Sequence, residues 1–246
     1  MTFSLFNRAR KNRPPPRTAP GQRIYAIGDI HGRVDLLTAL LEKIVADAGA
    51  SAGLEHILVY LGDYIDRGPD SDRIIEILTA PPPAGFQAHY LMGNHEDMMV
   101  QFIDGENDVQ VWLGNGGRET LYAYGCDEIL DLDQTRVDLL AALPARHLEF
   151  LRSLKSHHQN GDYLFVHAGI RPGVPIEAQS DTDMMWIRGS FLKSKENFGK
   201  FVIHGHSIRP EPEICGNRIG IDTGAWRTGV LTCLVLDGTQ KNFIST

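Results

Sequence analysis

The sequence predicts an α/β protein, because a short apolar run, a glycine-bounded polar turn and a helical pattern follow one another three times. The apolar runs lie at 23–27, 57–61 and 88–92, and the first two are rich in the β-branched and aromatic residues that favour strands. Each run leads into a turn with Asp, Asn or His, and then into apolar residues at helical spacing. Such units indicate parallel strands joined by crossover helices.

The composition fits a soluble protein with a hydrophobic core. The chain has 246 residues, of which 42% are hydrophobic and 22% charged, which suits one large α/β domain or two small ones. A formal net charge of −7 argues against a dedicated nucleic-acid binder, which usually carries a basic face. Three widely spaced cysteines favour reduced thiols over a disulfide framework. No apolar run approaches the roughly 20 residues of a membrane span, so we expect a cytoplasmic protein without a transmembrane segment.

The N-terminal residues 1–22 differ from the rest of the chain. They contain several Arg and Lys residues, no acidic residue and the run Pro14–Pro16. Proline and like charges keep such a segment extended, so we predict a basic, proline-rich disordered tail. The alternative is an arm that docks a partner or an anionic membrane surface.

The regular pattern of strand, turn and helix weakens after the third unit. Glycines and aromatic residues alternate without clear periodicity from residue 103, and two short helices are expected at 136–143 and 144–154. We therefore predict a small, mostly helical cap-like insertion at about 103–160, with its aromatic residues in the core of the cap. His157, His158 and the Asn160–Gly161 pair are expected in a surface turn.

The second half of the sequence contains further strand candidates. The runs 163–166 and 201–203 are apolar throughout, and 218–221 (RIGI) is a further candidate that leads into Asp222. Alternation predicts a strand over 229–236 and a last one near 242–244. Between the runs 163–166 and 201–203, we expect a loop at about 171–183. Arg188 follows the apolar stretch 184–187 and is a candidate functional residue.

Five of the predicted strands lead into turns rich in the Asp, Asn and His side chains from which metal sites are built. The candidates are Asp29, His31, Asp63, Asp66, Arg67, Asn94, His95, His167 and His206. The Asp, Asn and His members are a mixed oxygen and nitrogen set that suits Mn²⁺, Fe²⁺ or Zn²⁺, and does not form a calcium cage or a thiolate zinc site. The set is larger than one ion needs, and it suffices for two ions if one carboxylate bridges them.

The same residues resemble a known family. The motifs 28–32 (GDIHG), 62–68 (GDYIDRG), 93–96 (GNHE) and 167–169 (HAG), together with His206, are similar in order and spacing to those of the phosphoprotein phosphatases within the calcineurin-like metallophosphoesterases. The compact bacterial serine/threonine phosphatases are the most similar members. The resemblance implies that residues 23–246 form a metallophosphoesterase domain, a central β-sandwich of mixed sheets flanked by helices with a small helical cap.

The resemblance also implies a role for each site residue. Two divalent ions, Mn²⁺ first with Fe²⁺ or Zn²⁺ as alternatives, would support direct attack of a metal-bridging hydroxide on a phosphate ester. His95 would protonate the leaving group, Asp66 would orient His95, and Arg67 and Arg188 would bind the phosphate. The implied metal ligands are Asp29, His31, Asp63, Asn94, His167 and His206. His204 and Glu96 are expected to support the site without binding a metal.

The substrate is less well specified than the metals. We expect phosphoserine or phosphothreonine in proteins. The segment 221–226, however, also resembles bacterial diadenosine tetraphosphate hydrolases, so a dinucleoside polyphosphate is the alternative. A metal-dependent nuclease is disfavoured by the acidic composition and by Asp66 and Arg67. A non-catalytic phosphate-binding scaffold is disfavoured because no ligand or acid is missing.

Overall fold

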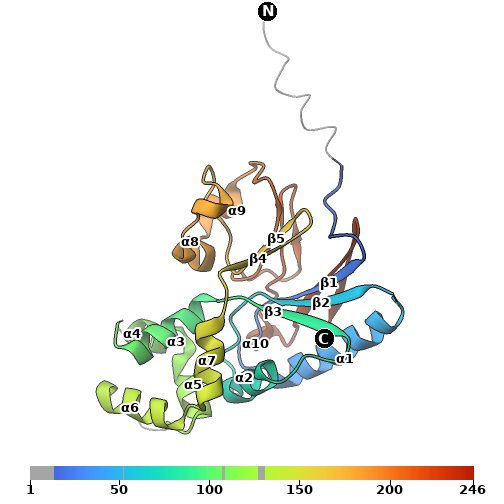
Figure 1. Ribbon diagram of the computed structural model, residues 1–246. Helices are drawn as coiled ribbons and strands as arrows, with labels where there is room; N and C mark the ends of the chain where they lie inside the picture. Colours follow the sequence, from blue (N-terminus) through green and yellow to red (C-terminus); the bar gives the residue numbers. More distant parts are fainter. Residues whose placement is uncertain (1–13, 52, 107–108, 127–130) are drawn as a thin grey trace, which may run out of the picture.

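Two five-stranded sheets pack face to face in the computed structural model, which describes residues 14–246 except 52, 107–108 and 127–130 (Figure 1). The first sheet has the order β10-β9-β1-β2-β3 and the second the order β4-β5-β6-β8-β7. Each combines parallel and antiparallel pairs, which confirms the predicted α/β sandwich of mixed sheets. The strands are β1 Gln22–Ile27, β2 Glu55–Tyr60, β3 Phe86–Tyr90, β4 His157–Asn160, β5 Tyr163–Val166, β6 Phe201–His204, β7 Glu213–Ile214, β8 Arg218–Gly220, β9 Thr232–Asp237 and β10 Gln240–Ser245.

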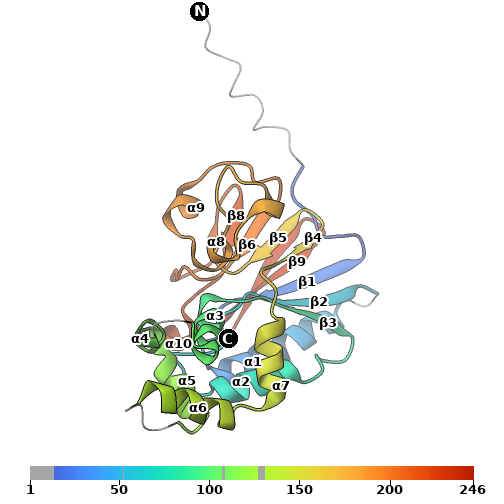
Figure 2. The ribbon, with the colours of Figure 1, turned by 60° about the vertical axis from the view of Figure 1, so that its left-hand side comes forward.

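Alternation along the strands divides the core into layers. In β1, Ile24 and Ala26 pack between the sheets, whereas Tyr25 and Ile27 pack against helices. The outer face of the first sheet is covered by α1 Val34–Gly49, α2 Ser71–Thr79 and α3 Asn94–Asp104. The outer face of the second sheet packs against α8 Asp181–Trp186 and α9 Gly189–Lys193. Figure 2 shows both helical layers with the two sheets between them.

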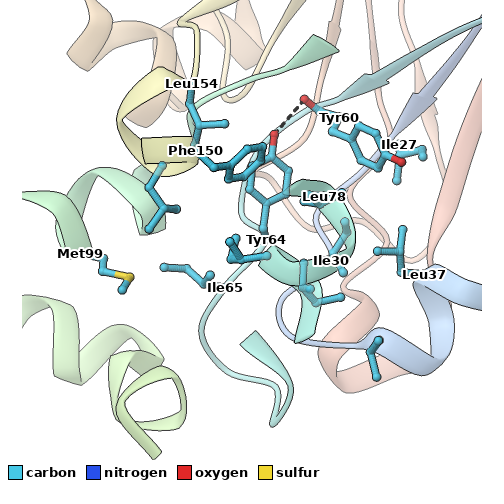
Figure 3. Packing of buried hydrophobic residues seen from close by; sticks show 14 of the residues in the cluster. Ile27, Ile30, Leu37, Tyr60, Tyr64, Ile65, Leu78, Met99, Phe150 and Leu154 are labelled. Carbon is cyan, nitrogen blue, oxygen red and sulfur yellow. Dashed lines mark hydrogen bonds between the residues drawn. The ribbon is translucent and has the colours of Figure 1, made fainter. Parts of the chain in front are cut away.

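The turn that follows β2 is anchored in the core. Tyr64 is fully buried, and its hydroxyl donates to the carbonyl oxygens of Leu91, at 2.7 Å, and Tyr60, at 3.3 Å. Its ring lies 6.1 Å from that of Phe150, centroid to centroid (Figure 3). Tyr64 lies next to Asp63 in the chain, so this packing also holds one of the predicted metal ligands in place.

The predicted cap is helical, and it packs beside α2 and α3. Its elements are α4 Val109–Trp112, a π-helical turn Leu113–Gly117, α5 Arg118–Ala123, α6 Leu132–Ala142 and α7 Ala145–Ser153. The prediction of a surface turn at His157 and His158 is wrong, because both residues belong to β4, an edge strand that pairs with β5. A tertiary contact explains the strand: the ring of His158 stacks on His89 of β3 at 3.8 Å. The turn comes later, at Gly161 with φ 52°.

Part of the predicted tail is ordered. The backbone N–H of Arg17 donates to the carboxylate of Asp162, and Thr18 and Gly238 exchange hydrogen bonds. The partners are far away in the sequence, so local composition could not indicate them. The predicted disorder and docking role of residues 1–13 lie outside the described residues, and the domain boundaries remain a prediction.

The remaining elements are short. They are a 3₁₀ turn η2 Ile176–Ala178 within the expected loop, and α10 Ala225–Thr228 near the end of the chain. The three cysteines form no disulfide in the part of the chain that the structure describes. None of the described helices combines the length and the apolar character that crossing a membrane requires.

Candidate metal centre

The predicted site residues lie at adjacent strand ends. The turn after β1 carries two of them, the turn after β2 three, the start of α3 two, and the segments after β5 and β6 one each. Because parallel strands end at the same edge of a sheet, these turns meet. All but Arg67 are buried: Asp29, His31, Asp63, Asp66, Asn94, His95, His167 and His206. Arg188, between α8 and α9, is exposed.

Backbone strain is concentrated in these turns. Among the described residues, every non-glycine residue with positive φ is a predicted site residue, and the values range from 47° to 71°. The left-handed region is unfavourable for residues with a Cβ, and such residues cluster at functional sites. The five are His31, Asp63, Asp66, Arg67 and His206.

Two groups of side chains could each hold a metal ion, and Asp63 belongs to both. One group adds His31 and His95, the other adds His167 and His206, with the ligand atoms of each group within 4.8 Å of one another. The Oδ2 atom of Asp63 lies 3.5 Å from His31 Nε2, and its Oδ1 atom lies 3.4 Å from His167 Nε2. Asp63 is therefore positioned to bridge two ions.

Backbone carbonyl groups orient two of the imidazoles. His31 Nδ1 lies 2.8 Å from the carbonyl oxygen of Ile65, and His167 Nδ1 lies 2.9 Å from that of Leu61. A carbonyl oxygen only accepts, so each Nδ1 carries the proton and each Nε2 presents a lone pair, which is the arrangement of metal-binding histidines. His167 Nε2 also lies 3.0 Å from Asn94 Oδ1 and 3.1 Å from His206 Nδ1, two further ligand atoms.

Asp29 is less closely integrated than the shared carboxylate of Asp63. Asp29 is in neither three-residue group, and both of its carboxylate oxygens accept the backbone N–H of His206, at 3.0 and 3.2 Å. A side chain on Gly205 would collide with the Asp29 carboxylate, so glycine is required beside it. Asp29 is thus held against the second group from the opposite sheet.

The electrostatics of the cluster favour bound cations. Burial and the charges of Asp222 and Asp63 raise the pKa of Asp29 well above its usual value. Burial lowers the pKa of His206 to about 2, with His167 contributing, so the imidazole is neutral and able to bind a metal. The buried Nε2 atom of His206 has no hydrogen-bond partner among the described residues. Crowded carboxylates and neutral imidazoles fit two divalent ions.

Glu96 organises the turn that carries Asp63. Its buried carboxylate accepts four backbone N–H groups, at 2.7–3.2 Å, from Asp63, Tyr64, Ile65 and Gly93. These bonds tie the turn after β2 to the start of α3. Glu96 therefore supports the site without lying in either ligand group, as expected from the sequence.

His95 differs from the other histidines because a carboxylate holds its Nδ1 atom. The distance from His95 Nδ1 to Asp66 Oδ2 is 2.7 Å. Asp66 is itself held by the helical segment, since Trp112 Nε1 donates to it at 2.9 Å and the Thr120 hydroxyl at 2.5 Å. Trp112 is buried, as expected for the cap, but its indole N–H links the cap to His95. The sequence did not indicate these contacts, because one buried tryptophan resembles any other.

Arg67 lies over the first metal group. Its guanidinium donates to His31 Nε2 at 2.8 Å and stacks on the ring of Trp226 at 5.6 Å. Its backbone N–H donates to Gly116, within the π-helical turn. Arg67 and Arg188 line one cavity, with His206 at its edge. His204 faces away from the ligand groups and contacts the carbonyl of Gly205 and the guanidinium of Arg218.

The sandwich and its donor set define a metallophosphoesterase, a class in which strand-end carboxylates and imidazoles hold metals beside a phosphate ester. The chain belongs to the calcineurin-like phosphoesterase family, whose sequence profile matches residues 22–217. Phosphoester hydrolysis with bound metal is the chemistry of that family.

Relatives with different names are about equally similar. The chain is 29% identical over 239 residues to asymmetrical bis(5′-nucleosyl)-tetraphosphatase PrpE of Geobacillus thermodenitrificans. The matched region covers 86% of this chain and 89% of that protein. The chain is 28% identical over 224 residues to serine/threonine-protein phosphatase 2 of Escherichia coli, covering 86% and 91%. The cold-active protein-tyrosine phosphatase of a psychrophilic Shewanella has the same fold, with a TM-score of 0.59, 17% identity and coverage of 96% and 83%.

Proposed function

We propose that the protein hydrolyses phosphate esters with two divalent ions bound on either side of Asp63. The proposed ligands of the first ion are Asp29, His31 and Asp63, and those of the second are Asp63, Asn94, His167 and His206. When bound, the ions, Mn²⁺ first and Fe²⁺ or Zn²⁺ as alternatives, would polarise the phosphoryl oxygens and lower the pKa of a water. The shared carboxylate of Asp63 and the orientation of the His31 and His167 imidazoles support this part of the assignment.

The hydrogen bond between His95 and Asp66 carries the proposal. A carboxylate at Nδ1 keeps the Nδ1 proton in place and stabilises the imidazolium, so the proton on Nε2 is the one available for transfer. That Nε2 atom lies 3.9 Å from Asp63 Oδ2, beside the metal groups. His95 would thus protonate the departing oxygen, and Asp66 would hold its orientation.

Arg67 and Arg188 are the proposed phosphate ligands. A guanidinium presents paired N–H donors that match two phosphate oxygens, and it stays charged at every relevant pH. Both residues line the cavity beside His206. Arg67 contacts His31 and Trp226, so its guanidinium lies close to the metal groups.

Phosphoserine or phosphothreonine in proteins is the first substrate candidate. The complete 62–68 motif and the similarity to the Escherichia coli phosphatase support it. A dinucleoside polyphosphate is the second candidate, supported by Trp226, whose segment lies against Arg67, and by the similarity to the tetraphosphatase. With Mn²⁺ present, turnover of a phosphopeptide and of diadenosine tetraphosphate, side by side with a chelator control, separates the two.

Replacing the acid tests the mechanism. We expect His95→Asn to reduce kcat by about 10²–10⁴-fold on an alkyl phosphate, whose leaving group needs a proton. The loss on p-nitrophenyl phosphate should be far smaller, because nitrophenolate leaves unprotonated. Equal losses on both esters, with an unchanged circular dichroism spectrum, would show that His95 has another role.

A further inference from the structure

A cavity beside the metal groups is lined by an unusual number of arginines. Its volume is about 330 Å³, close to the lower end of the range of ligand pockets. Half of its lining residues are arginines, none is a carboxylate, and the set is Arg67, Arg188, Arg209 and Arg227 with His206, Ser207, Ile208 and Leu192. In a chain of net charge −7, such a concentration of positive charge indicates an anion site.

Most of these guanidinium groups lack an acidic partner. Within the described part of the chain, no carboxylate oxygen lies within the 4.0 Å of an ion pair from Arg67, Arg188 or Arg227. Arg209 lies 3.6 Å from Glu213, whose other oxygen accepts from Arg218 at 2.6 Å. The charge in the cavity is therefore largely available to a ligand.

Ser207 provides an independent indication of a ligand. Its side chain is 6% exposed, and its hydroxyl finds no hydrogen-bond partner among the described residues, although it lines the same cavity. A buried hydroxyl without a partner is unfavourable, and native structures rarely retain one without a reason. An anion in the cavity would accept a hydrogen bond from this hydroxyl.

A single phosphate would not use all of these donors. Two divalent ions together with Arg67 and Arg188 already exceed the charge of one phosphate group. Arg209, Arg227 and Ser207 would then have no anion to bind. A second phosphate would supply one, and because all the donors line one small cavity, it must lie close to the first.

We infer that Arg209, Arg227 and Ser207 form a subsite for a second phosphate, so that the enzyme accepts a phosphoanhydride chain. This inference rests on the proposed phosphohydrolase function and favours its second substrate candidate. In the reaction, the oxygen of a water bonds to the attacked phosphorus, and the bridging P–O bond breaks. The bridging oxygen leaves on the neighbouring phosphate, and the water's protons pass to buffer or to the products.

The test compares two substrates in one double variant. With free Mn²⁺ held constant, kcat/KM is measured for diadenosine tetraphosphate and for p-nitrophenyl phosphate, in the wild type and in Arg209→Ala/Arg227→Ala. We expect kcat/KM for diadenosine tetraphosphate, divided by kcat/KM for p-nitrophenyl phosphate, to fall about 20-fold or more in the double variant. The fall should come mainly from a higher KM for diadenosine tetraphosphate, because charge-assisted bonds to its second phosphate are lost. The charge-matched control, Arg136→Ala/Arg146→Ala on α6 and α7, should keep the wild-type ratio.

A binding measurement separates this inference from the proposed function. Tryptophan fluorescence titrated with diadenosine tetraphosphate in the presence of a chelator gives Kd without turnover, and Ser207→Ala should weaken binding several-fold. An unchanged ratio and an unchanged Kd in the arginine variant overturn the subsite. An equal loss on a singly phosphorylated peptide also overturns it, since the arginines would then serve any anionic substrate. Absence of turnover of both diadenosine tetraphosphate and p-nitrophenyl phosphate by the wild type overturns the proposed function, and the Kd values still decide the subsite.

Discussion

The floor of the site and its rim are built in different ways. The floor consists of the turns after β1, β2 and β3, where buried side chains are held by backbone groups, as Glu96 holds the Asp63 turn. The rim consists of the exposed Arg188, Arg209 and Arg227 around the cavity. The floor is fixed by backbone hydrogen bonds, whereas the rim contributes exposed charge. We therefore expect the floor to determine whether a phosphate is cleaved, and the rim to determine which substrate presents it.

The largest expected effect comes from breaking the floor at Glu96. Glu96→Ala leaves four buried N–H groups without an acceptor, at 2.7–3.2 Å from the lost oxygens. We expect the free energy of unfolding to fall by about 3–5 kcal/mol and kcat to fall about 100-fold or more. Denaturant unfolding and p-nitrophenyl phosphate turnover measure the two losses. The exposed Glu149→Ala on α7 is the control, and wild-type turnover in Glu96→Ala would contradict the assigned role.

A smaller effect is expected where the helical segment supports the floor. Trp112→Phe removes the N–H donor at 2.9 Å from Asp66 but keeps an aromatic ring beside Phe102. We expect kcat to fall about tenfold, because one charge-assisted bond that orients His95 through Asp66 is lost. The loss should be greater for alkyl than for nitrophenyl esters. Tyr122→Phe on the neighbouring α5 should have no effect, and a loss independent of the leaving group would indicate a packing defect only.

Salt should distinguish the rim from the floor without any mutation. Exposed charges are screened over about 10 Å at 0.1 M ionic strength, and buried pairs are screened much less. Raising NaCl to about 0.5 M should therefore increase KM for diadenosine tetraphosphate several-fold and leave kcat nearly constant. Initial-rate kinetics over the salt series check this expectation. A parallel fall in kcat would mean that the floor is also exposed to screening.

The smallest effect concerns the contact between the two sheets that carry floor and rim. His158 of β4 stacks on His89 of β3, and burial lowers its pKa from 6.5 to about 4. The folded state thus binds fewer protons than the unfolded state between these pH values, so its stability is complete above pH 6.5 and declines towards pH 4. Because the residue is only partly buried, we expect a decline of about 1 kcal/mol.

His158→Phe should flatten that decline, because phenylalanine keeps the stack and cannot titrate. Urea unfolding at several pH values measures it, with His157→Phe, the neighbouring residue in β4, as the control. A decline that persists unchanged in His158→Phe would assign the pH dependence to other groups.

The strands that bear motifs were the most predictable parts of the molecule. The run 163–166 matches β5, because its aromatic and β-branched residues favour a strand and a turn follows them. The polar residues of β4 show no period, and its pairing with β5 and its stack on His89 are tertiary contacts that the local sequence does not indicate. The segment from Arg17 to Ala19 was assigned to the tail for a similar reason, because its partners Asn160 and Asp162 are remote in sequence.

The sequence by itself determined the chemistry of this protein: which side chains stand at the strand ends, and the family to which they belong. Those features are local, because a turn of glycine, aspartate and histidine carries its ligand atoms wherever it is placed. Only the tertiary structure decided which residues support and surround that chemistry. Trp112 reaches Asp66, and Arg209 and Arg227 meet at one cavity, through contacts between segments far apart in the chain. Side-chain distances across a fold depend on packing, which no short motif encodes.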